Sequence, residues 1–214
     1  MNTVAIIDYG MSNLRSVHKA LEHVAPHARI YVTDDPRRVR EAARIVFPGQ
    51  GAIGECMERL RARGLDEAIV ETLHARPFLG ICLGLQALMG FSEENGGTPG
   101  LGAFPGSVVR FPEDARDPDG GRLKIPHMGW NEVHRTRDHP LWDDIARDDR
   151  FYFVHSYHVV PEDGALVAAT TPYAGGFASA LARDNIFAVQ FHPEKSQRAG
   201  LTLLRNFLRW DGTA

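Results

Sequence analysis

Residues 77–89, Pro77-Phe-Leu-Gly-Ile-Cys-Leu-Gly-Leu-Gln-Ala-Leu-Met89, contain the pattern that decides the fold. The apolar run up to Ile81 predicts a buried strand, and the run from Leu83 to Met89 predicts a helix. Cys82 stands between them, with a glycine two residues away on each side. A Gly-x-nucleophile-x-Gly sequence where a strand meets a helix is typical of the nucleophile elbow, here with sulfur in place of oxygen. The stretch therefore predicts an α/β fold with a reactive thiol at a strand end.

Two physical effects explain the neighbours of Cys82. The turn is so tight that the nucleophile is strained, and side chains at Gly80 and Gly84 would collide with neighbouring backbone. A thiol at a helix N-terminus also meets the positive end of the helix dipole, which favours the reactive thiolate. The alternative is that Cys82 is a small buried apolar residue. Cys56 has no such context on its predicted helix, and we interpret it as a packing residue.

Strand and helix patterns alternate on the N-terminal side of this stretch. Apolar runs predict strands at 4–8, 29–32 and 44–47. Apolar residues spaced by three and four from Leu14 to Val24 predict a helix, for which Ser12 or Asn13 can serve as N-cap. Further helices are predicted at 36–43, 55–63 and 66–74. This alternation favours a parallel sheet covered by helices.

The pattern changes after Ser107, where strands follow one another with few helices between them. They are predicted at 108–111, 130–134, 151–155, 166–170, 177–183 and 186–191. An antiparallel or mixed extension of the sheet is therefore expected. Residues 112–121 combine acidic residues, proline and glycine and predict a solvated loop, and Leu201, Leu204 and Leu208 mark a closing amphipathic helix.

The composition excludes several classes of protein. With 214 residues, of which 43% are hydrophobic and 24% charged, we expect one globular domain spanning 1–214. The 24 Lys and Arg against 27 Asp and Glu give a net charge of −3 without blocks of like charge, so we expect neither a nucleic-acid nor a membrane partner. The apolar runs are too short for a secretion signal or a membrane span. We therefore expect a cytoplasmic protein, in which a disulfide between the two cysteines is disfavoured.

A thiol nucleophile needs a base, and the base needs an orienting group. The sequence Gln190-Phe-His-Pro-Glu194 places the imidazole of His192 and the carboxylate of Glu194 two residues apart, with Pro193 stiffening the connection. His192 can take the thiol proton and later donate it to the leaving group, while Glu194 holds the ring. Taken alone, the same residues are compatible with a surface turn. Their combination with the elbow favours catalysis.

The third requirement is a hydrogen-bond donor for the oxyanion of a tetrahedral intermediate. Pro48-Gly49-Gln50-Gly51 follows a predicted strand, and loops beyond the carboxyl ends of parallel strands converge on one crevice with the elbow. The glycines allow a peptide of this loop to present its N–H or to rotate. Pro-Gly-x-Gly is also a common turn. We therefore take Gly49, Gln50 and Gly51 as an oxyanion-loop hypothesis.

Together, Gly80-Ile-Cys82-Leu-Gly-Leu-Gln86, Pro48-Gly-Gln-Gly51 and His192-Pro-Glu194 resemble the pattern of class I glutamine amidotransferases. Over nearly its whole length the chain resembles the glutaminase subunits of imidazole glycerol phosphate synthases. The resemblance is carried further by two stretches, Lys124-Ile-Pro-His-Met-Gly-Trp-Asn131 and Phe153-Val-His-Ser-Tyr157. It implies a flavodoxin-like three-layer α/β sandwich, with a mostly parallel central sheet and an antiparallel extension.

The resemblance also implies roles for individual residues. Cys82 is implied as the thioester-forming nucleophile, His192 as general base and acid, and Glu194 as its orienting group. Residues implied to hold glutamine are Gly51, Gln86, Ser156 and Tyr157. Residues implied to face a partner are Asn13, Trp130 and Lys195; considered singly, these suggest a helix cap, a core residue and a solvated charge. Two positions depart from the expected pattern, since Gln50 replaces an apolar residue and His158 stands where an aromatic residue is expected.

The implied activity is hydrolysis of L-glutamine to L-glutamate and ammonia through a glutamyl thioester. The ammonia would pass to the heterodimer partner, a (β/α)₈ barrel that is the cyclase subunit in histidine biosynthesis, and the triad would be poorly active until that partner sets the oxyanion loop. No cofactor is expected. The scattered histidines give no basis for a metal site: His127, His134, His139, His155 and His158. Alternatives are a glutaminase subunit of another synthase, a free-standing cysteine amidase of the same fold, or a catalytically silent regulatory subunit.

Overall fold

The computed structural model describes residues 3–10, 14–117 and 119–213. Five parallel strands form one half of its large sheet, in the order β2-β1-β3-β4-β14. Their bounds are β1 Thr3–Ile7, β2 Arg29–Thr33, β3 Arg44–Gly49, β4 Phe78–Cys82 and β14 Ile186–Val189. The predicted strands are confirmed with small shifts at their ends. Strand β3 is two residues longer than predicted, so that Gly49 pairs with Cys82.

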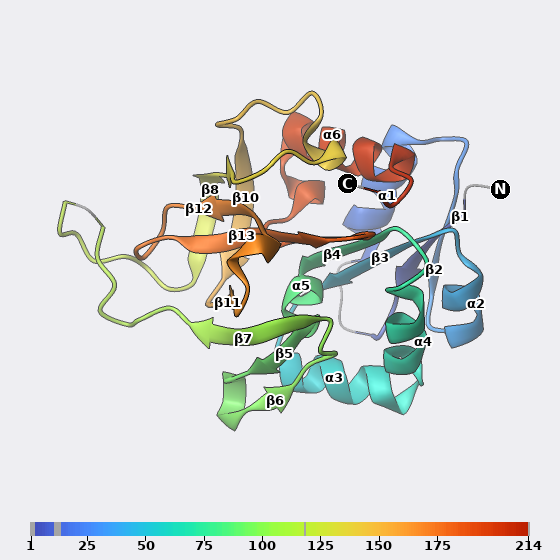
Figure 1. The fold of residues 1–214 in the computed structure, drawn as a ribbon, viewed down its shortest axis with the longest axis horizontal. Coiled ribbons are helices and arrows are strands. Elements are labelled where there is room, and N and C mark those ends of the chain that lie inside the picture. The colour runs from blue at the N-terminus through green and yellow to red at the C-terminus, as the bar shows by residue number, and fades with distance from the viewer. Residues whose placement is uncertain (1–2, 11–13, 118, 214) are drawn as a thin grey trace.

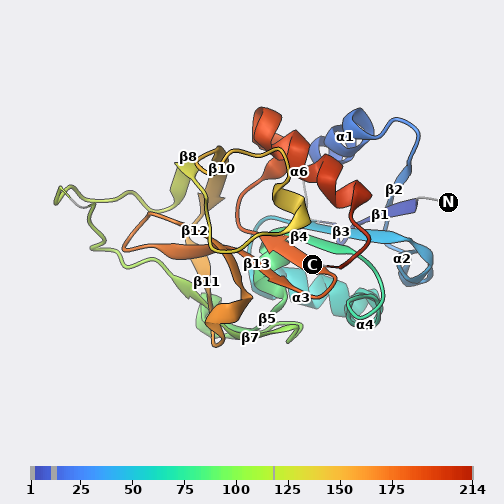
Figure 2. The same cartoon turned by 45° about the horizontal axis from the view of Figure 1, so that its top comes forward.

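Helices cover both faces of this parallel half. Helices α1 and α6 pack together on one face, and α2, α3 and α4 lie on the other, as both views of the ribbon show (Figures 1 and 2). Their bounds are α1 Leu14–Val24, α2 Pro36–Glu41, α3 Ile53–Ala62, α4 Leu65–Thr72 and α6 Gln197–Arg209. The candidate caps Ser12 and Asn13 lie outside the described residues. The predicted three-layer α/β arrangement is confirmed.

Beyond β14 the sheet continues with mixed polarity. Strand β13 is antiparallel to β14, and the order then runs β13-β11-β7-β5-β6, with β12 pairing with both β13 and β9. The bounds are β5 Met89–Ser92, β6 Thr98–Pro99, β7 Phe104–Arg110, β9 His134–Arg135, β11 Tyr157–Pro161, β12 Val167–Thr171 and β13 Phe177–Arg183. Strands β8, His127–Glu132, and β10, Arg150–His155, form a separate antiparallel pair. The antiparallel extension is thus confirmed.

The sheet separates two apolar cores because side chains alternate along each strand. In β1, Val4 and Ile6 join the core under α1 and α6, whereas Ala5 and Ile7 join the core under α3 and α4. Complete burial of such an aliphatic side chain contributes about 1.5–3 kcal/mol. Both cores include residues of β3, β4 and β14, so packing on each face of the sheet fixes the strand ends that carry the site.

Two predicted elements differ from the observed ones. Helix α5 spans only Leu83–Ala87, because the chain from Met89 pairs with β7 as strand β5 instead of continuing the helix. The strand predicted at 130–134 is divided, because β8 pairs with β10 whereas β9 pairs with β12. In both places the bounds of the element depend on the strand with which it pairs, and the local apolar pattern does not identify that strand.

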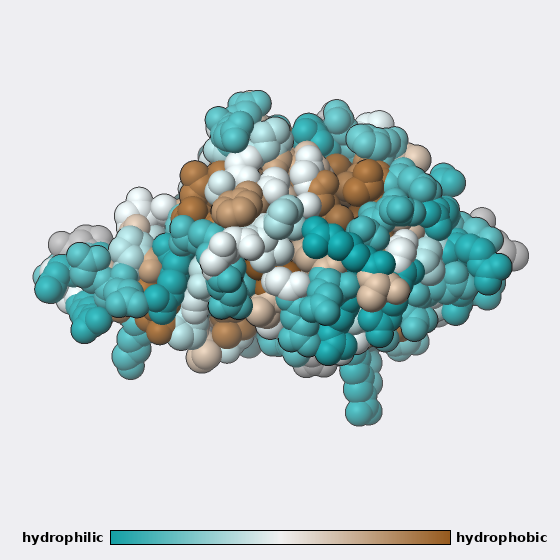
Figure 3. Space-filling view, turned by 90° about the horizontal axis from the view of Figure 1, so that it is seen from below, coloured by the Kyte–Doolittle hydropathy of each residue, from teal (hydrophilic) through white to brown (hydrophobic). Residues whose placement is uncertain are grey.

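Among the residues that the structure describes, a few large apolar side chains remain at the surface. They are Val70, Phe91, Met128, Trp130 and Val160. Figure 3 shows one face of the molecule, where hydrophilic residues surround smaller apolar areas. Within the described ranges, the helices are all too short or too polar to cross a bilayer.

Candidate active site

Cys82 lies at the tight turn from strand β4 to helix α5. Its backbone has φ 55° and ψ −108°, a region that residues with a side chain rarely adopt. A Cβ on Gly84 would lie 1.9 Å from the carbonyl oxygen of Phe47, and one on Gly80 would lie 3.0 Å from Cβ of Ala188. The strain and the small neighbours expected of a nucleophile elbow are therefore present. Because α5 has only five residues, its dipole supplies little of the electrostatics.

His192 and Glu194 form a buried pair just beyond β14. The chain turns there in a short 3₁₀ helix, Pro193–Lys195, which brings His192 Nδ1 to 2.9 Å from Glu194 Oε1. The hydroxyl of Ser196 donates to the carbonyl of His192 and accepts from the backbone N–H of Tyr152. The segment is thereby fixed against β10, with the ring nitrogen donating to the carboxylate.

The electrostatics of His192 favour its protonated ring. Burial lowers the pKa of this histidine, but the negative charge of Cys82 and the hydrogen-bonded carboxylate of Glu194 outweigh burial and raise that pKa above its ordinary value. An imidazolium of this kind is the natural partner of a thiolate. The other thiol behaves differently, since burial raises the pKa of Cys56 to about 12. Both cysteines are free.

A pocket of about 290 Å³ opens on Cys82 and His192. All four residues predicted to hold the substrate line it: Gly51, Gln86, Ser156 and Tyr157. Gln50 and Lys195 line it as well. Gly49 and Glu194 do not, since Gly49 belongs to β3 beside Cys82 and Glu194 holds His192 at its other ring nitrogen. The fold thus brings together residues that are far apart in the sequence.

The candidate oxyanion loop is held in a defined conformation. The backbone N–H of Gln50 donates to the hydroxyl of Tyr9 at 3.3 Å, and that hydroxyl lies close to Gly49, where a Cβ would come within 2.7 Å of it. This N–H therefore does not face the pocket. Gly51 has φ 90°, which only glycine adopts without strain. A rotation of the loop is needed before Gln50 can donate to an oxyanion.

Three polar residues of the site were not among those predicted from the sequence. Glu94 lines the pocket and accepts the backbone N–H of Ile53 at 2.8 Å. His155 also lines it, and Gln190 lies beneath Cys82 with its Nε2 at 3.6 Å from the sulfur. Glu94 stands in a stretch, Glu93-Glu-Asn-Gly-Gly97, that has the composition of a turn. The Gln190-Phe-His-Pro-Glu194 motif contained Gln190, and its position two residues before the base was the available signal.

Two of the three predicted partner-facing residues can be located. Trp130 is 41% exposed, so the alternative of a core residue is wrong for it. Its ring contacts Tyr152 edge-on at 6.1 Å between centroids, and Lys195 Nζ lies 5.9 Å from the centroid of the same tyrosine. Asn13 lies outside the described residues. Trp130 and the pocket-lining Lys195 thus share Tyr152 as a neighbour.

The departure at His158 has a simple physical explanation. Its ring stacks on Phe111, with 4.6 Å between centroids and 24° between planes. Burial lowers the pKa of His158, which favours the neutral ring. The imidazole therefore fills the place of an aromatic residue.

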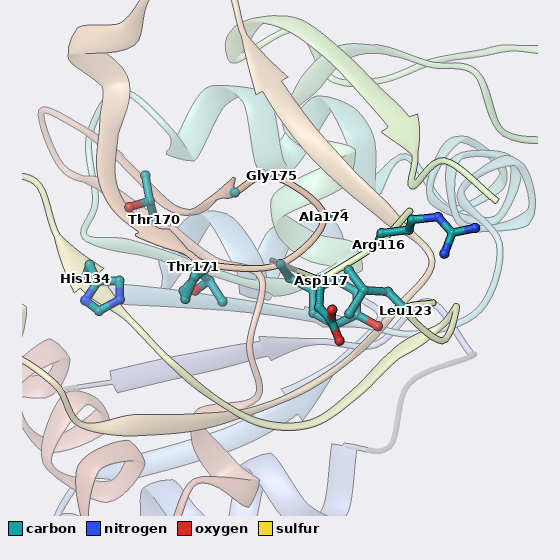
Figure 4. A pocket seen from close by; sticks show the side chains of 11 residues that line it. Arg116, Asp117, Leu123, His134, Thr170, Thr171, Ala174 and Gly175 are labelled. Carbon is teal, nitrogen blue, oxygen red and sulfur yellow. The ribbon is translucent and has the colours of Figure 1, made fainter. Parts of the chain in front are cut away.

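A larger hollow of about 540 Å³ lies elsewhere (Figure 4). Arg116 and Asp117 lie on one side of it and His134 on the opposite side, with Thr170 and Thr171 between them (Figure 4). None of the lining residues belongs to the predicted site. In the part of the chain that the structure describes, no three His, Cys, Asp or Glu side chains are grouped to hold a metal ion.

The comparisons with known proteins show the family to which the chain belongs. The family model "Glutamine amidotransferase class-I" matches residues 5–210. The chain belongs to the class I glutamine amidotransferase family and is a glutamine amidotransferase, as the sequence predicted.

Within that family, full-length relatives carry one particular name. The chain is 60% identical over 214 residues, 100% of both chains, to "Imidazole glycerol phosphate synthase subunit HisH" of Nitrosococcus oceani. It is 60% identical over 212 residues, 98% of this chain and 99% of the other, to the protein of that name from Aromatoleum aromaticum. A solved structure described as a glutamine amidotransferase has a TM-score of 0.72 at 15% identity, covering 98% of this chain and 99% of the other. This last likeness concerns the fold alone.

Proposed function

We propose that the chain, as a single glutaminase domain over 1–214, hydrolyses L-glutamine with Cys82, His192 and Glu194 as its triad. One observation carries the proposal: a strained Cys82 shares a pocket with His192, whose far ring nitrogen is held by buried Glu194. The thiolate attacks the amide carbon, and His192 gives its proton to the departing ammonia. Water then attacks the glutamyl thioester while His192 takes a proton from it. Glutamate leaves and the thiolate returns. These steps use the triad side chains and one water molecule and need no cofactor.

The pocket supplies complementary groups for a glutamine molecule. Gln86 and the backbone of Gly51, Ser156 and Tyr157 line the pocket with Cys82 and would hold the glutamine, and Glu94 would offer a carboxylate to its α-ammonium group. The oxyanion of the tetrahedral intermediate needs a donor, and removing one such donor typically costs about 3 kcal/mol of transition-state stabilisation. Gln50 N–H takes that role after the loop leaves Tyr9. The isolated chain is accordingly a slow glutaminase.

We further infer a partner, the (β/α)₈ cyclase subunit of an imidazole glycerol phosphate synthase, bound as a heterodimer in histidine biosynthesis. Support comes from the name of the relatives, and from Met128, 62% exposed, beside Trp130 on strand β8. Lys195 at the pocket rim belongs to the same proposed interface, as does Asn13. Ammonia is protonated in bulk water, so a shielded passage to the cyclase preserves the nucleophile. Two free cysteines favour the reducing cytoplasm as the place of work.

A paired assay tests the activity and the partner together. Glutamate release is measured for the full chain alone, with the cyclase subunit, and with the cyclase and its nucleotide ligand. We expect a low rate alone and a rate that rises at least tenfold in the complex. Trp130→Ala should weaken co-purification with the cyclase while leaving the slow isolated activity unchanged.

The alternatives give different results in the same assay. Stimulation by the synthase subunit of another pathway, and none by the cyclase, would assign the chain to that synthase. Turnover of peptides without turnover of glutamine would indicate a free-standing amidase. A complex without any glutamate release would indicate a silent regulatory subunit.

A further inference from the structure

Gln190 occupies the first position after strand β14, directly beneath the nucleophile. Its side chain has no solvent exposure, and its Nε2 lies 3.6 Å from Cys82 Sγ, within range of an N–H···S hydrogen bond. The two residues come together because β14 pairs in parallel with β4, with Val189 opposite Ile81. The amide of Gln190 is not a member of the triad, so its position next to the sulfur of Cys82 is not explained by the roles of His192 and Glu194.

Neighbouring hydrogen bonds fix which end of this amide faces the sulfur. Gln86 Nε2 donates to the carbonyl of Tyr157 at 3.0 Å and to Oε1 of Gln190 at 3.1 Å. A carbonyl only accepts, so the orientation of Gln86 is set first, and Gln190 must present its oxygen to Gln86. Its NH₂ group is therefore turned toward Cys82. The reverse orientation would face two NH₂ groups and press a carbonyl oxygen against the thiolate.

The carbonyl of Tyr157 is in turn held by a chain of neutral histidines. His155 Nδ1 lies 2.8 Å from this carbonyl and must donate to it, so His155 Nε2 accepts from His127 Nδ1 at 3.0 Å. Burial lowers the pKa of His127 to about 4 and that of His155 to about 3, which keeps both rings neutral near pH 7. The donor and the acceptor of each hydrogen bond in this network are thus assigned. The last bond of the network is the one from Gln190 to the sulfur of Cys82.

We propose that Gln190 is a positioning residue for Cys82, and that its Nε2–H donates to the sulfur and stabilises the thiolate in the orientation for attack. A hydrogen bond to a charged acceptor is stronger than one to a neutral acceptor, so the contact favours the thiolate over the thiol. The same N–H meets the sulfur again when the thioester C–S bond breaks and its electron pair returns to sulfur. The inference rests on the proposed function, because it takes Cys82 as the nucleophile.

The pH dependence of thiol alkylation tests this role without glutamine. Full-length protein is treated with iodoacetamide across a pH series, and mass spectrometry follows labelling at Cys82 and at Cys56 separately. Gln190→Met keeps an unbranched side chain of similar length and removes the donor. We expect the midpoint of the Cys82 rate profile to move to higher pH by about one unit, a change of about 1.4 kcal/mol. The rate below the midpoint falls about tenfold, and the two proteins converge at high pH.

Ser179→Ala is the matched control. Ser179 is fully buried on β13, and its backbone carbonyl accepts the backbone N–H of Gln190 at 2.9 Å. The substitution removes only a side-chain hydroxyl and leaves this backbone contact in place. Its profile should coincide with that of the parent. A purely structural role of Gln190 would slow labelling at every pH without moving the midpoint. That result, or an unchanged profile in folded Gln190→Met, overturns the proposal.

A second variant and the enzymatic assay complete the test. Gln190→Leu removes the same donor with a different shape, and it decides the matter if the Met variant does not fold. For glutamine hydrolysis we expect kcat to fall about tenfold with a smaller change in KM. If the parent labels at Cys82 and hydrolyses glutamine, and the Gln190 variants behave like the parent, only the role of Gln190 is refuted. A parent inert at Cys82 refutes the proposed function as well.

Discussion

His192 Nδ1 lies 2.9 Å from Glu194 Oε1, and the two side chains are only 6% and 4% exposed. A turn of the chain across Pro193 produces this pair, so the orientation of the ring depends on one local segment. The carboxylate fixes the tautomer whose other nitrogen faces the pocket, and it stabilises the imidazolium.

Glu194→Gln tests this relationship. The amide keeps the size of the side chain but removes the carboxylate charge that, after Cys82, helps to raise the pKa of His192. By analogy with triads that lose their carboxylate, kcat for glutamine should fall by about 100-fold or more while KM changes little. Steady-state kinetics of the cyclase complex measure both. Glu113→Gln, which alters an exposed ion pair with Arg110, is the control and should retain the parent kinetics. Parent-like kcat in Glu194→Gln would contradict the assigned role.

Gly84→Ala tests the packing of the nucleophile elbow. Its Cβ would lie 1.9 Å from Phe47 O, a backbone atom that cannot move aside without distorting β3. We expect the free energy of unfolding to fall by at least about 3 kcal/mol, the upper part of the range for overpacked sites. Gly164→Ala is the control, since its Cβ meets nothing within 4 Å and its φ is not positive. Denaturant unfolding measures both, and equal stability of the two variants would refute the steric account.

The sequence was informative where a short segment decides the structure. The Gly80-Ile-Cys82-Leu-Gly84 pattern predicted the strained turn, since tight backbone geometry selects glycine locally. His192 and Glu194 were predicted because they stand two positions apart in one short segment. The contact between Gln86 and Gln190 spans 104 residues and arises from strand pairing, which no local pattern encodes. The short length of α5 was missed because β5 competes for its last residues.

Tyr9→Phe tests the resting state of the oxyanion loop. The variant removes the hydroxyl that accepts the N–H of Gln50 at 3.3 Å and keeps the ring that packs against Phe47. A hydrogen bond is worth about 0.5–1.5 kcal/mol net, so the glutaminase rate of the isolated chain should rise roughly 2- to 10-fold. The gain should shrink in the cyclase complex. Tyr31→Phe, whose hydroxyl donates to the carbonyl of Arg38 away from the site, is the control. An unchanged or lower basal rate in Tyr9→Phe would contradict the interpretation.

His139→Asn tests the acid sensitivity of the fold. Burial lowers the pKa of His139 to about 4 from an ordinary 6.5, so below pH 6.5 the unfolded chain binds a proton that the folded chain does not. This histidine therefore costs stability as the pH falls from about 6.5 toward 4. Asn keeps an acceptor for Leu141 N–H, which His139 Nδ1 now accepts, and does not titrate.

The measurement is the free energy of unfolding at pH 7 and at pH 4.5. His139→Asn should lose about 2 kcal/mol less than the parent between these values. Its stability at pH 7 should be lower, since the smaller side chain packs less well against Phe187 and Trp210. His27→Asn, at an exposed position, should keep the parent's pH dependence. Identical slopes for all three proteins would show that His139 does not contribute.

Active-site labelling shows whether Cys82 carries the glutamyl group during hydrolysis. The cyclase complex is treated with a glutamine analogue that has an electrophilic carbon in place of the amide, and mass spectrometry locates the adduct while glutamate release is followed. We expect one adduct per chain, on Cys82 and not on Cys56, with activity lost in proportion to labelling. The Cys82→Ala variant should neither label nor release glutamate. An adduct on another residue, or glutamate release retained by Cys82→Ala, would contradict this role of Cys82.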